Sequence, residues 1–245
     1  MYYNLLLLII LLFIAKMDAS LSSYTISKIQ NDIHLIPKTS KYTHTFIWLH
    51  GLGDSPQSYL DFFVSNEIVP KTTKIILLCA PYASVTCFNN FKANSWFDMY
   101  SGNPQTEKDY NFEDVQKNSL RIFDIIEKES IALNNNYKNI YIGGFSQGAM
   151  LSLYIGLSYK KQIGGIIACS GILFPQTNII NKETNVFIGH GINDSRINID
   201  LALKSYKPIL NFDNVQMKKY NFLDHSINEI ELNDIKEFFK HCLNL

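Results

Sequence analysis

Residues 144–148, Gly-Phe-Ser-Gln-Gly, have the G-x-S-x-G spacing of a nucleophile elbow. The pattern follows an apolar run (139–143) and precedes a helix-like run that starts at Gln147. In such an elbow the serine lies on a tight strand-to-helix turn, where flanking glycines avoid steric clashes. The start of a helix also directs its positive end toward an oxyanion formed at the serine. The segment therefore predicts that Ser146 is the nucleophile of an acyl-transfer reaction.

A serine nucleophile needs a base and an acid, and behind an elbow they follow in the order acid, then histidine. His225 lies between the last strand-like run and the last helix-like run, and Asp194 follows another strand-like run. Since the carboxyl ends of parallel strands meet at one edge of a sheet, both residues should lie near the elbow. We predict a triad of Ser146, Asp194 and His225, in which the histidine moves the proton and the aspartate holds its ring.

Other residues of the right type are less well placed. Asp224 adjoins His225 directly and would have difficulty turning back onto its ring. His241 lies deep in the last helix-like run, where a surface role is expected, and His190 at a strand end is expected to be structural. The remaining acids between the serine and His225 are Glu183, Asp200 and Asp213.

The oxyanion of the tetrahedral intermediate needs two N–H donors. One is expected from Gln147, directly after the nucleophile, and the other from the loop after an early strand. That loop is 49–54, Leu-His-Gly-Leu-Gly-Asp, and the N–H of Leu52 is our candidate. Two glycines in a loop could also cradle a phosphate. The loop lacks the G-x-G-x-x-G pattern and a P-loop lysine, so this alternative carries little weight.

Short apolar runs alternate with helix-length segments along the chain, which favours one α/β domain with helices on both faces of a mostly parallel sheet. The predicted strands are 34–37, 45–50, 74–79, 139–143, 163–170, 186–190 and 215–220. The predicted helices are 57–66, 112–133, 147–157, 199–211 and 230–242. The segment 81–111 has no clear periodicity, and long loops are often functional, so we expect it to bind substrate.

Composition excludes several classes of function. Lys plus Arg and Asp plus Glu number 22 each, so no basic surplus is available for nucleic acid, which is not an expected partner. Hydrophobic residues make up 47% of the chain, enough for a buried core. The four cysteines, Cys79, Cys87, Cys169 and Cys242, have no metal-ligand spacing and are expected to be structural. Serine-based covalent catalysis needs no metal and no organic cofactor, and we expect neither.

The N-terminus contains an unbroken apolar run, Leu5–Ala15. Eleven residues at ~1.5 Å each span roughly half of a ~30 Å hydrocarbon core, so a membrane-spanning helix is not expected. The run has the length of a signal-peptide core, although no Lys or Arg precedes it and the residues near Ala19 are not a clean cleavage site. We predict a signal peptide or N-terminal hydrophobic segment at 1–19, followed by a single domain at 20–245. The protein would then be secretory, or cytoplasmic if the segment is not functional as a signal.

Taken together, the segments resemble the acyl-protein thioesterase, or phospholipase/carboxylesterase, family of small α/β-hydrolases. The resemblance runs from about residue 30 to 240 and rests on 48–54, 80–81, 85–86, 95–98, 144–153, 190–194 and 225–226. It implies the α/β-hydrolase fold and hydrolysis of long-chain acyl thioesters on S-acylated proteins, often with activity on lysophospholipids and simple esters. It also implies the same triad and the same two oxyanion donors.

The chain departs from the family pattern in two places. Ser195 and Arg196 follow the acid where family members commonly have proline, and 87–94 carries aromatic residues and a lysine in place of methionine and glycine. Both segments are expected to border the acyl groove, for which we name Phe88, Phe91 and Trp96 as candidates. Aromatic residues are more often core or pocket wall than reactants, and we assign 96–98 such a role.

Three functions remain open at this point. The first is a depalmitoylating thioesterase acting through an acyl-serine, and the second is a lysophospholipase or general carboxylesterase acting on oxygen esters. The third is a non-catalytic lipid- or protein-binding module on a hydrolase scaffold. The expected partners are an acylated protein or a lysophospholipid or other ester, which allows transient contact with a membrane surface. The sequence leaves the oligomeric state open.

Overall fold

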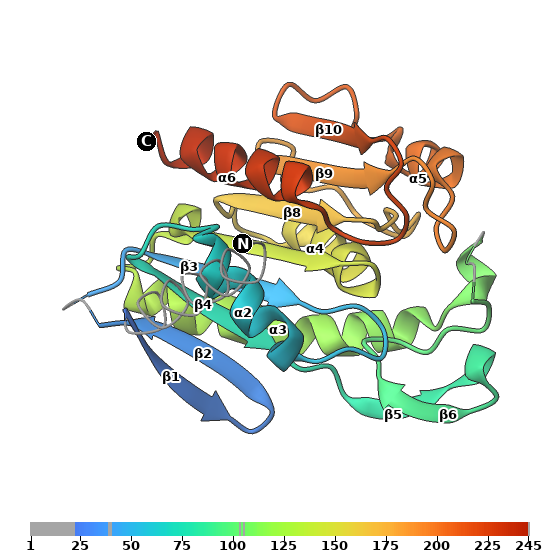
Figure 1. The fold of residues 1–245 in the computed structure, drawn as a ribbon, viewed down its shortest axis with the longest axis horizontal. Helices are drawn as coiled ribbons and strands as arrows, with labels where there is room; N and C mark the ends of the chain where they lie inside the picture. Colours follow the sequence, from blue (N-terminus) through green and yellow to red (C-terminus); the bar gives the residue numbers. More distant parts are fainter. Residues whose placement is uncertain (1–22, 39–40, 103, 105, 245) are drawn as a thin grey trace, which may run out of the picture.

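The computed structural model describes residues 23–38, 41–102, 104 and 106–244. Its main feature is a sheet in the order β1-β2-β4-β3-β7-β8-β9-β10 (Figure 1). Strands β3, β4, β7, β8, β9 and β10 are parallel, whereas β2 is antiparallel to both β1 and β4. The strands are β1 (Tyr24–Ile29), β2 (Asp32–Pro37), β3 (His44–Leu49), β4 (Thr73–Leu78), β7 (Ile140–Phe145), β8 (Gly165–Cys169), β9 (Asn185–Gly191) and β10 (Val215–Tyr220). The predicted mostly parallel α/β fold is confirmed.

Helices cover both faces of this sheet (Figure 1). One face packs against α3 (Phe112–Ala132), α4 (Gln147–Ser158) and α5 (Ile199–Tyr206), and the other against α2 (Pro56–Asn66) and α6 (Glu229–Leu243). The central strands are buried on both faces, which explains why they read as continuous apolar runs rather than alternating ones.

The predicted elements agree with the structure to within a few residues at most ends. The largest difference is α5, which ends at Tyr206 rather than at residue 211. Pro208 follows closely and has no N–H to donate, so it interrupts the hydrogen-bond ladder of the helix. Strand β1 was not predicted, because Lys28 stands where the alternation of Tyr24 and Ile26 calls for an apolar residue, and most of the strand is exposed.

The segment 81–111, predicted as a long loop, contains a small hairpin of its own. Strands β5 (Tyr82–Val85) and β6 (Phe91–Asn94) pair antiparallel and project from the body beside α3 (Figure 1). Asn89 and Asn90 have positive φ angles of 55° and 61° in the connection, where asparagine tolerates the left-handed region. Strands of four largely exposed residues carry no burial-driven periodicity, which is why the sequence pattern missed them.

The predicted N-terminal segment at 1–19 lies outside the described residues. Among the helices that the structure does describe, none is both long enough and apolar enough to cross a membrane.

Candidate active site

Ser146 lies on a sharp turn between β7 and α4, with φ 55° and ψ −118°. A positive φ is unfavourable for a residue with a side chain, and such strain persists only where the surroundings enforce it. Here the Ser146 N–H donates to the carbonyl of Cys169 at 2.8 Å, and the Ser146 carbonyl accepts from Met150 at 3.1 Å. The turn is therefore held from the adjacent strand β8 and from the first turn of α4.

The two glycines of the elbow are required by close backbone packing. A Cβ at Gly144 would lie 2.5 Å from the carbonyl carbon of Gly148. A Cβ at Gly148 would lie 2.1 Å from the carbonyl oxygen of Leu49, at the end of β3. Both distances are shorter than non-bonded atoms allow, and backbone cannot move aside as a flexible side chain can. The spacing thus lets the turn pack directly against β3, where the loop 49–54 begins.

Ser146, His225 and Asp194 form a hydrogen-bonded chain across three connections at the carboxyl edge of the sheet. The Ser146 hydroxyl lies 2.8 Å from His225 Nε2, and His225 Nδ1 lies 2.8 Å from Asp194 Oδ2. With the Nδ1 proton directed at the carboxylate, Nε2 is free to accept the hydroxyl proton. This is the geometry in which a histidine can act as a general base on a serine.

Asp194 follows β9 and is only 5% exposed. Besides the imidazole it accepts hydrogen bonds from the backbone N–H groups of Arg196 at 2.9 Å and Ile197 at 2.8 Å. Burial disfavours the charged carboxylate, but these donors outweigh it, and the pKa of Asp194 lies below its usual value. The carboxylate is therefore ionised and fixed in direction.

His190 also lies beside this carboxylate, 3.4 Å from Asp194, yet it does not reach the serine. Its Nε2 donates to the Ile197 carbonyl at 2.8 Å, and burial lowers the pKa of the ring. His190 is therefore a neutral, buried side chain that supports the loop carrying Asp194, as expected for a structural residue.

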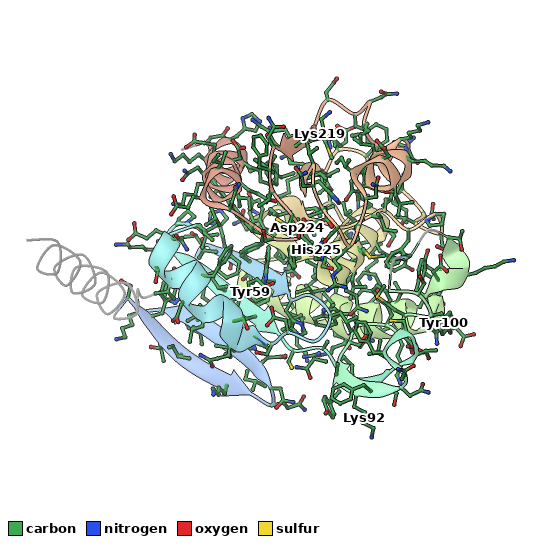
Figure 2. All side chains as sticks on the ribbon, turned by 45° about the vertical axis from the view of Figure 1, so that its right-hand side comes forward. Tyr59, Lys92, Tyr100, Lys219, Asp224 and His225 are labelled. Atoms are coloured by element: carbon green, nitrogen blue, oxygen red, sulfur yellow. The ribbon has the colours of Figure 1, made fainter. Side chains whose placement is uncertain are left out.

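Asp224 connects the loops that carry the acid and the histidine. Its Oδ1 accepts the backbone N–H of Ser195 at 2.8 Å and that of His225 at 2.8 Å. The hydrogen bond from Ser195 is the largest cause that holds the pKa of Asp224 below its usual value. As expected, this carboxylate does not bond the imidazole, but sequence reasoning missed its bridging contact. Figure 2 labels Asp224 and His225, which lie together near the middle of this face.

Leu52 and Gln147 both line the cavity above Ser146. Within the described residues, neither backbone N–H has a hydrogen-bond acceptor. For Gln147 this follows from its place as the first residue of α4, whose N–H has no partner inside the helix. The two donors that the sequence predicts are therefore both available at the cavity.

His50 fixes the loop that carries Leu52. Its Nε2 accepts the backbone N–H of Ala80 at 3.0 Å, so the proton is on Nδ1, which donates to the Gly51 carbonyl at 2.6 Å. The Trp96 indole N–H in turn donates to the His50 carbonyl at 2.8 Å. Holding the Gly51 carbonyl in this way sets the peptide plane that carries the Leu52 N–H.

The Gln147 side chain ties the elbow to the segment 95–97. Its Oε1 accepts the Trp96 N–H at 2.8 Å, and its Nε2 donates to the Phe97 carbonyl at 2.8 Å. Nε2 also donates to the hydroxyl of Ser95 at 3.1 Å. The amide is thus fully engaged through its side chain, which leaves only its backbone N–H for the cavity.

The cavity over Ser146 has a volume of about 320 Å³. It is lined by Gly51, Leu52, Asp54, Phe88, Met99, Gly102, Pro104, Phe145, Ser146, Gln147, Met150, Arg196, Ile197 and His225. Of the three predicted groove residues, Phe88 lines it and the other two differ from expectation. Phe91 is 72% exposed on the hairpin, and Trp96 is fully buried because its indole packs on His50 beneath the loop.

Arg196 lines the cavity, as expected for the segment that departs from the family pattern after Asp194. Met99 lies in the segment 81–111, which was expected to bind substrate, but it was not named individually. Met150 was not predicted as a lining residue, because it lies inside the helical run after the elbow and its apolar side chain has no signal that separates it from a core residue.

The phospholipase/carboxylesterase family model matches residues 30–243. The chain belongs to this family. It is 35% identical to the acyl-protein thioesterase 1 of Candida albicans over 80% of this chain and 91% of that protein. It is also 31% identical to the acyl-protein thioesterase 1 of Saccharomyces cerevisiae, over 87% of this chain and 99% of that protein. The predicted resemblance is confirmed, and the protein is a serine hydrolase of this family.

Solved structures of similar proteins share the fold. SOBER1 from Arabidopsis thaliana superposes with a TM-score of 0.70 at 28% identity, covering 82% of this chain and 99% of that chain. Acyl-protein thioesterase 2 from Zea mays superposes with a TM-score of 0.73 at 22% identity, covering 86% and 98%. Both confirm the predicted α/β-hydrolase architecture.

Proposed function

We propose that this phospholipase/carboxylesterase-family member is an acyl-protein thioesterase that works through an acyl-Ser146 intermediate. The observation that carries the proposal is the hydrogen-bonded chain of Ser146, His225 and Asp194 beneath a cavity with two free N–H donors. The thioester specificity is supported by the relatives, which are named acyl-protein thioesterases.

In the first half-reaction the Ser146 hydroxyl attacks the carbonyl carbon of the acyl thioester while His225 Nε2 takes the hydroxyl proton. The carbonyl oxygen becomes an oxyanion, and the N–H groups of Leu52 and Gln147 donate to it. Asp194 stabilises the imidazolium that forms. The C–S bond then breaks, the leaving sulfur receives the proton from His225, and the acyl group stays on Ser146.

In the second half-reaction a water molecule takes the place of the thiol. His225 removes a proton from this water as it attacks the acyl-Ser146 carbonyl, and the same N–H donors hold the second oxyanion. Collapse breaks the bond to the serine oxygen, which takes the proton back from His225, and the fatty acid leaves. Apart from the substrate and this water molecule, both half-reactions use only groups of the chain.

The lining of the cavity supports an apolar acyl group. Phe88, Met99, Phe145 and Met150 present hydrocarbon and thioether surface, and methionine adapts readily to flexible chains. The alternative of a lysophospholipase or carboxylesterase acting on oxygen esters fits the same residues, and the family description covers it. The two substrates share one triad, so only turnover separates them.

The test compares an S-palmitoylated peptide with the palmitoyl lysophospholipid of matched chain length. We expect the thioester to be the better substrate by kcat/KM. If only the oxygen ester is hydrolysed, the enzyme is a lysophospholipase or carboxylesterase and the thioesterase proposal is wrong.

A fluorophosphonate probe tests the nucleophile and the third candidate, a non-catalytic module. We expect labelling of the wild type and none of Ser146→Ala, with turnover reduced by roughly 10⁶-fold. Ser158→Ala makes the same change near the other end of α4, away from the cavity, and should label normally. A wild type that does not label would favour the non-catalytic module.

His225→Ala should lower turnover by several orders of magnitude and leave a residual rate from the oxyanion donors. Near-normal turnover in this variant would mean that another group is the base.

The compartment in which the enzyme acts stays a prediction. The family match begins at residue 30, after the apolar run Leu5–Ala15. N-terminal sequencing of the protein from its native source would show whether 1–19 are removed. An intact Met1 would contradict a cleaved signal peptide and favour the cytoplasmic alternative.

A further inference from the structure

Arg196 places an unpaired cation in the lining of the cavity. Its side chain is exposed, and its position is fixed by the backbone N–H that donates to Asp194. Within the described residues, no carboxylate lies within ion-pair distance of its guanidinium. The lining contains one formal anion, Asp54, whose carboxylate already accepts the Ser55 N–H and the Ser58 hydroxyl.

Arginine is rare in this chain, which makes its placement informative. Of the 22 basic side chains, two are arginines, Arg121 and Arg196. Arg121 is fully engaged, because it contacts both oxygens of Asp32 at 2.6 and 2.5 Å and donates to the Cys79 carbonyl at 2.8 Å. Lysine contributes a positive charge, whereas arginine contributes a positive charge and a planar set of donors that matches carboxylate and phosphate groups. Arg196 lines the cavity, and its side-chain donors have no hydrogen-bond or ion-pair partner among the residues that the structure describes.

The loops of the site relate Arg196 to His225 more closely than to the oxyanion donors. The oxyanion donors come from Leu52, in the loop after β3, and from Gln147, at the start of α4. Arg196 comes from the loop of Asp194, which Asp224 joins to the loop of His225. Because His225 gives its proton to the departing group, we expect a side chain from these joined loops to reach that group rather than the oxyanion.

We infer that Arg196 binds an oxyanion, either a carboxylate or a phosphate, carried by the leaving group next to the scissile acyl bond. The inference rests on the proposed function and names the substrates it prefers: acyl thioesters or esters whose leaving group is negatively charged. The formal net charge of the chain is zero, so no general field draws anions to the molecule, and the preference is local to Arg196.

The experiment uses two pairs of substrates with the same octanoyl chain. In the peptide pair, an S-octanoylated cysteine has either aspartate or asparagine as its neighbour. In the glycerol pair, octanoyl glycerol phosphate is compared with octanoyl glycerol. Each pair differs in the negative charge of the leaving group and keeps the acyl group unchanged. For the pair whose leaving group carries the oxyanion that Arg196 binds, we expect the wild type to hydrolyse the charged member with a kcat/KM about tenfold higher than the neutral member. This ratio corresponds to about 1.4 kcal/mol.

Arg196→Gln should abolish that preference by raising KM for the charged member far more than for the neutral member. Arg196→Lys should retain part of it, since it keeps the charge but loses the planar donors. Lys219→Gln is the matched control, because it removes one positive charge from an exposed residue of β10 that does not line the cavity. Figure 2 shows Lys219 apart from His225.

Each outcome is decisive. Loss of preference in the peptide pair assigns the oxyanion to a peptide carboxylate, and loss in the glycerol pair assigns it to a lipid phosphate. An Arg196→Gln variant with the wild-type preference in both pairs, or a Lys219→Gln variant with the same loss as Arg196→Gln, overturns the inference. Neither result touches the proposed function, which fails separately if the wild type cleaves no S-octanoylated peptide of either kind.

Discussion

Two buried carboxyl groups lie beside β9, and their pKa values are shifted in opposite directions. Asp194 follows the strand and is 5% exposed, whereas Glu231 in the first turn of α6 is fully buried against Gly189 in the middle of the strand. Asp194 accepts hydrogen bonds from His225, Arg196 and Ile197, and its pKa lies below the usual value.

Glu231 receives no such donors. Neither of its carboxyl oxygens accepts a hydrogen bond from nitrogen or oxygen in the described part of the chain, and beside it lies the Cys169 thiol, a weak donor. Burial raises the pKa of Glu231 to about 8. Burial is therefore common to both groups, and the supply of donors decides which one keeps its charge.

The backbone explains that supply. Asp194 lies in a loop, where the N–H groups of Arg196 and Ile197 are not committed to a ladder and can turn toward the carboxylate. Glu231 faces the paired positions Cys169 and Gly189, whose strands use their N–H groups in the sheet. The carboxyl edge of this sheet therefore supplies free N–H donors that a charged carboxylate needs, and Asp194 lies at that edge.

Neutralising each carboxylate in turn should produce the largest difference between the two groups. Asp194→Asn should lower kcat by roughly 10⁴-fold, because an amide cannot stabilise the imidazolium and favours the wrong tautomer of His225. Glu231→Gln should keep kcat within about twofold of wild type, because its carboxyl is already neutral at pH 7. Steady-state hydrolysis of an S-acyl peptide measures both. A comparable loss in the two variants would mean that Glu231 also acts on the site.

A second prediction concerns stability against pH, where the two groups act with opposite signs. Folded Glu231 holds a proton up to about pH 8, whereas the unfolded group loses it near its model value of 4.5. The folded state therefore binds more protons in this window, so the free energy of unfolding falls as pH rises from about 4.5 to about 8, by on the order of a few kcal/mol. For Asp194, whose pKa is lowered, stability is instead lost as pH falls below the usual carboxyl value of 3.8.

This linkage is tested by denaturant unfolding of wild type and Glu231→Gln between about pH 5 and pH 8, in steps of about one pH unit. The variant should lose most of the pH-dependent fall seen in wild type. Parallel curves for the two proteins would contradict a protonated Glu231 in the folded state. Glu183→Gln is the matched control, since it makes the same change at an exposed glutamate and should leave this part of the curve unchanged.

The smallest effect is expected at Asp224, which is exposed but joins the two loops. Asp224→Ala removes the acceptor of the Ser195 and His225 N–H groups and should lower kcat by roughly tenfold through misplacement of the imidazole. Asp224→Asn keeps an acceptor oxygen and should recover most of the rate. If the asparagine variant is as slow as the alanine variant, charge rather than positioning is what Asp224 provides.

Much of the site could be predicted because its residues follow local rules. The elbow at 144–148 is recognisable because steric limits within a few residues require its glycines. Asp194 and His225 each follow a predicted strand. The donors Leu52 and Gln147 follow from their places after a strand and at the start of a helix. These predictions depend only on residues that are close together in the sequence, and a sequence pattern includes all of them.

Other features could not be predicted because they depend on contacts between distant segments. Trp96 was expected in the groove, but its indole packs under His50. Asp224 was set aside as too close to His225, yet it bonds Ser195, 29 residues away. The hairpin β5–β6 has strands too short and too exposed to leave a periodic signal.

The fold class, the candidate nucleophile and the order of its partners could be predicted from residue types alone, because buried strands, helices and tight turns each impose a local pattern on residue type. The charge state of each buried carboxylate, the aromatic residues that line the cavity and the unpaired position of Arg196 in that lining follow instead from tertiary contacts. Those outcomes depend on which donors and which apolar surfaces meet across the sheet edge. The energy of a buried group is set by its neighbours in space, and the order of residues along the chain does not show which residues these are.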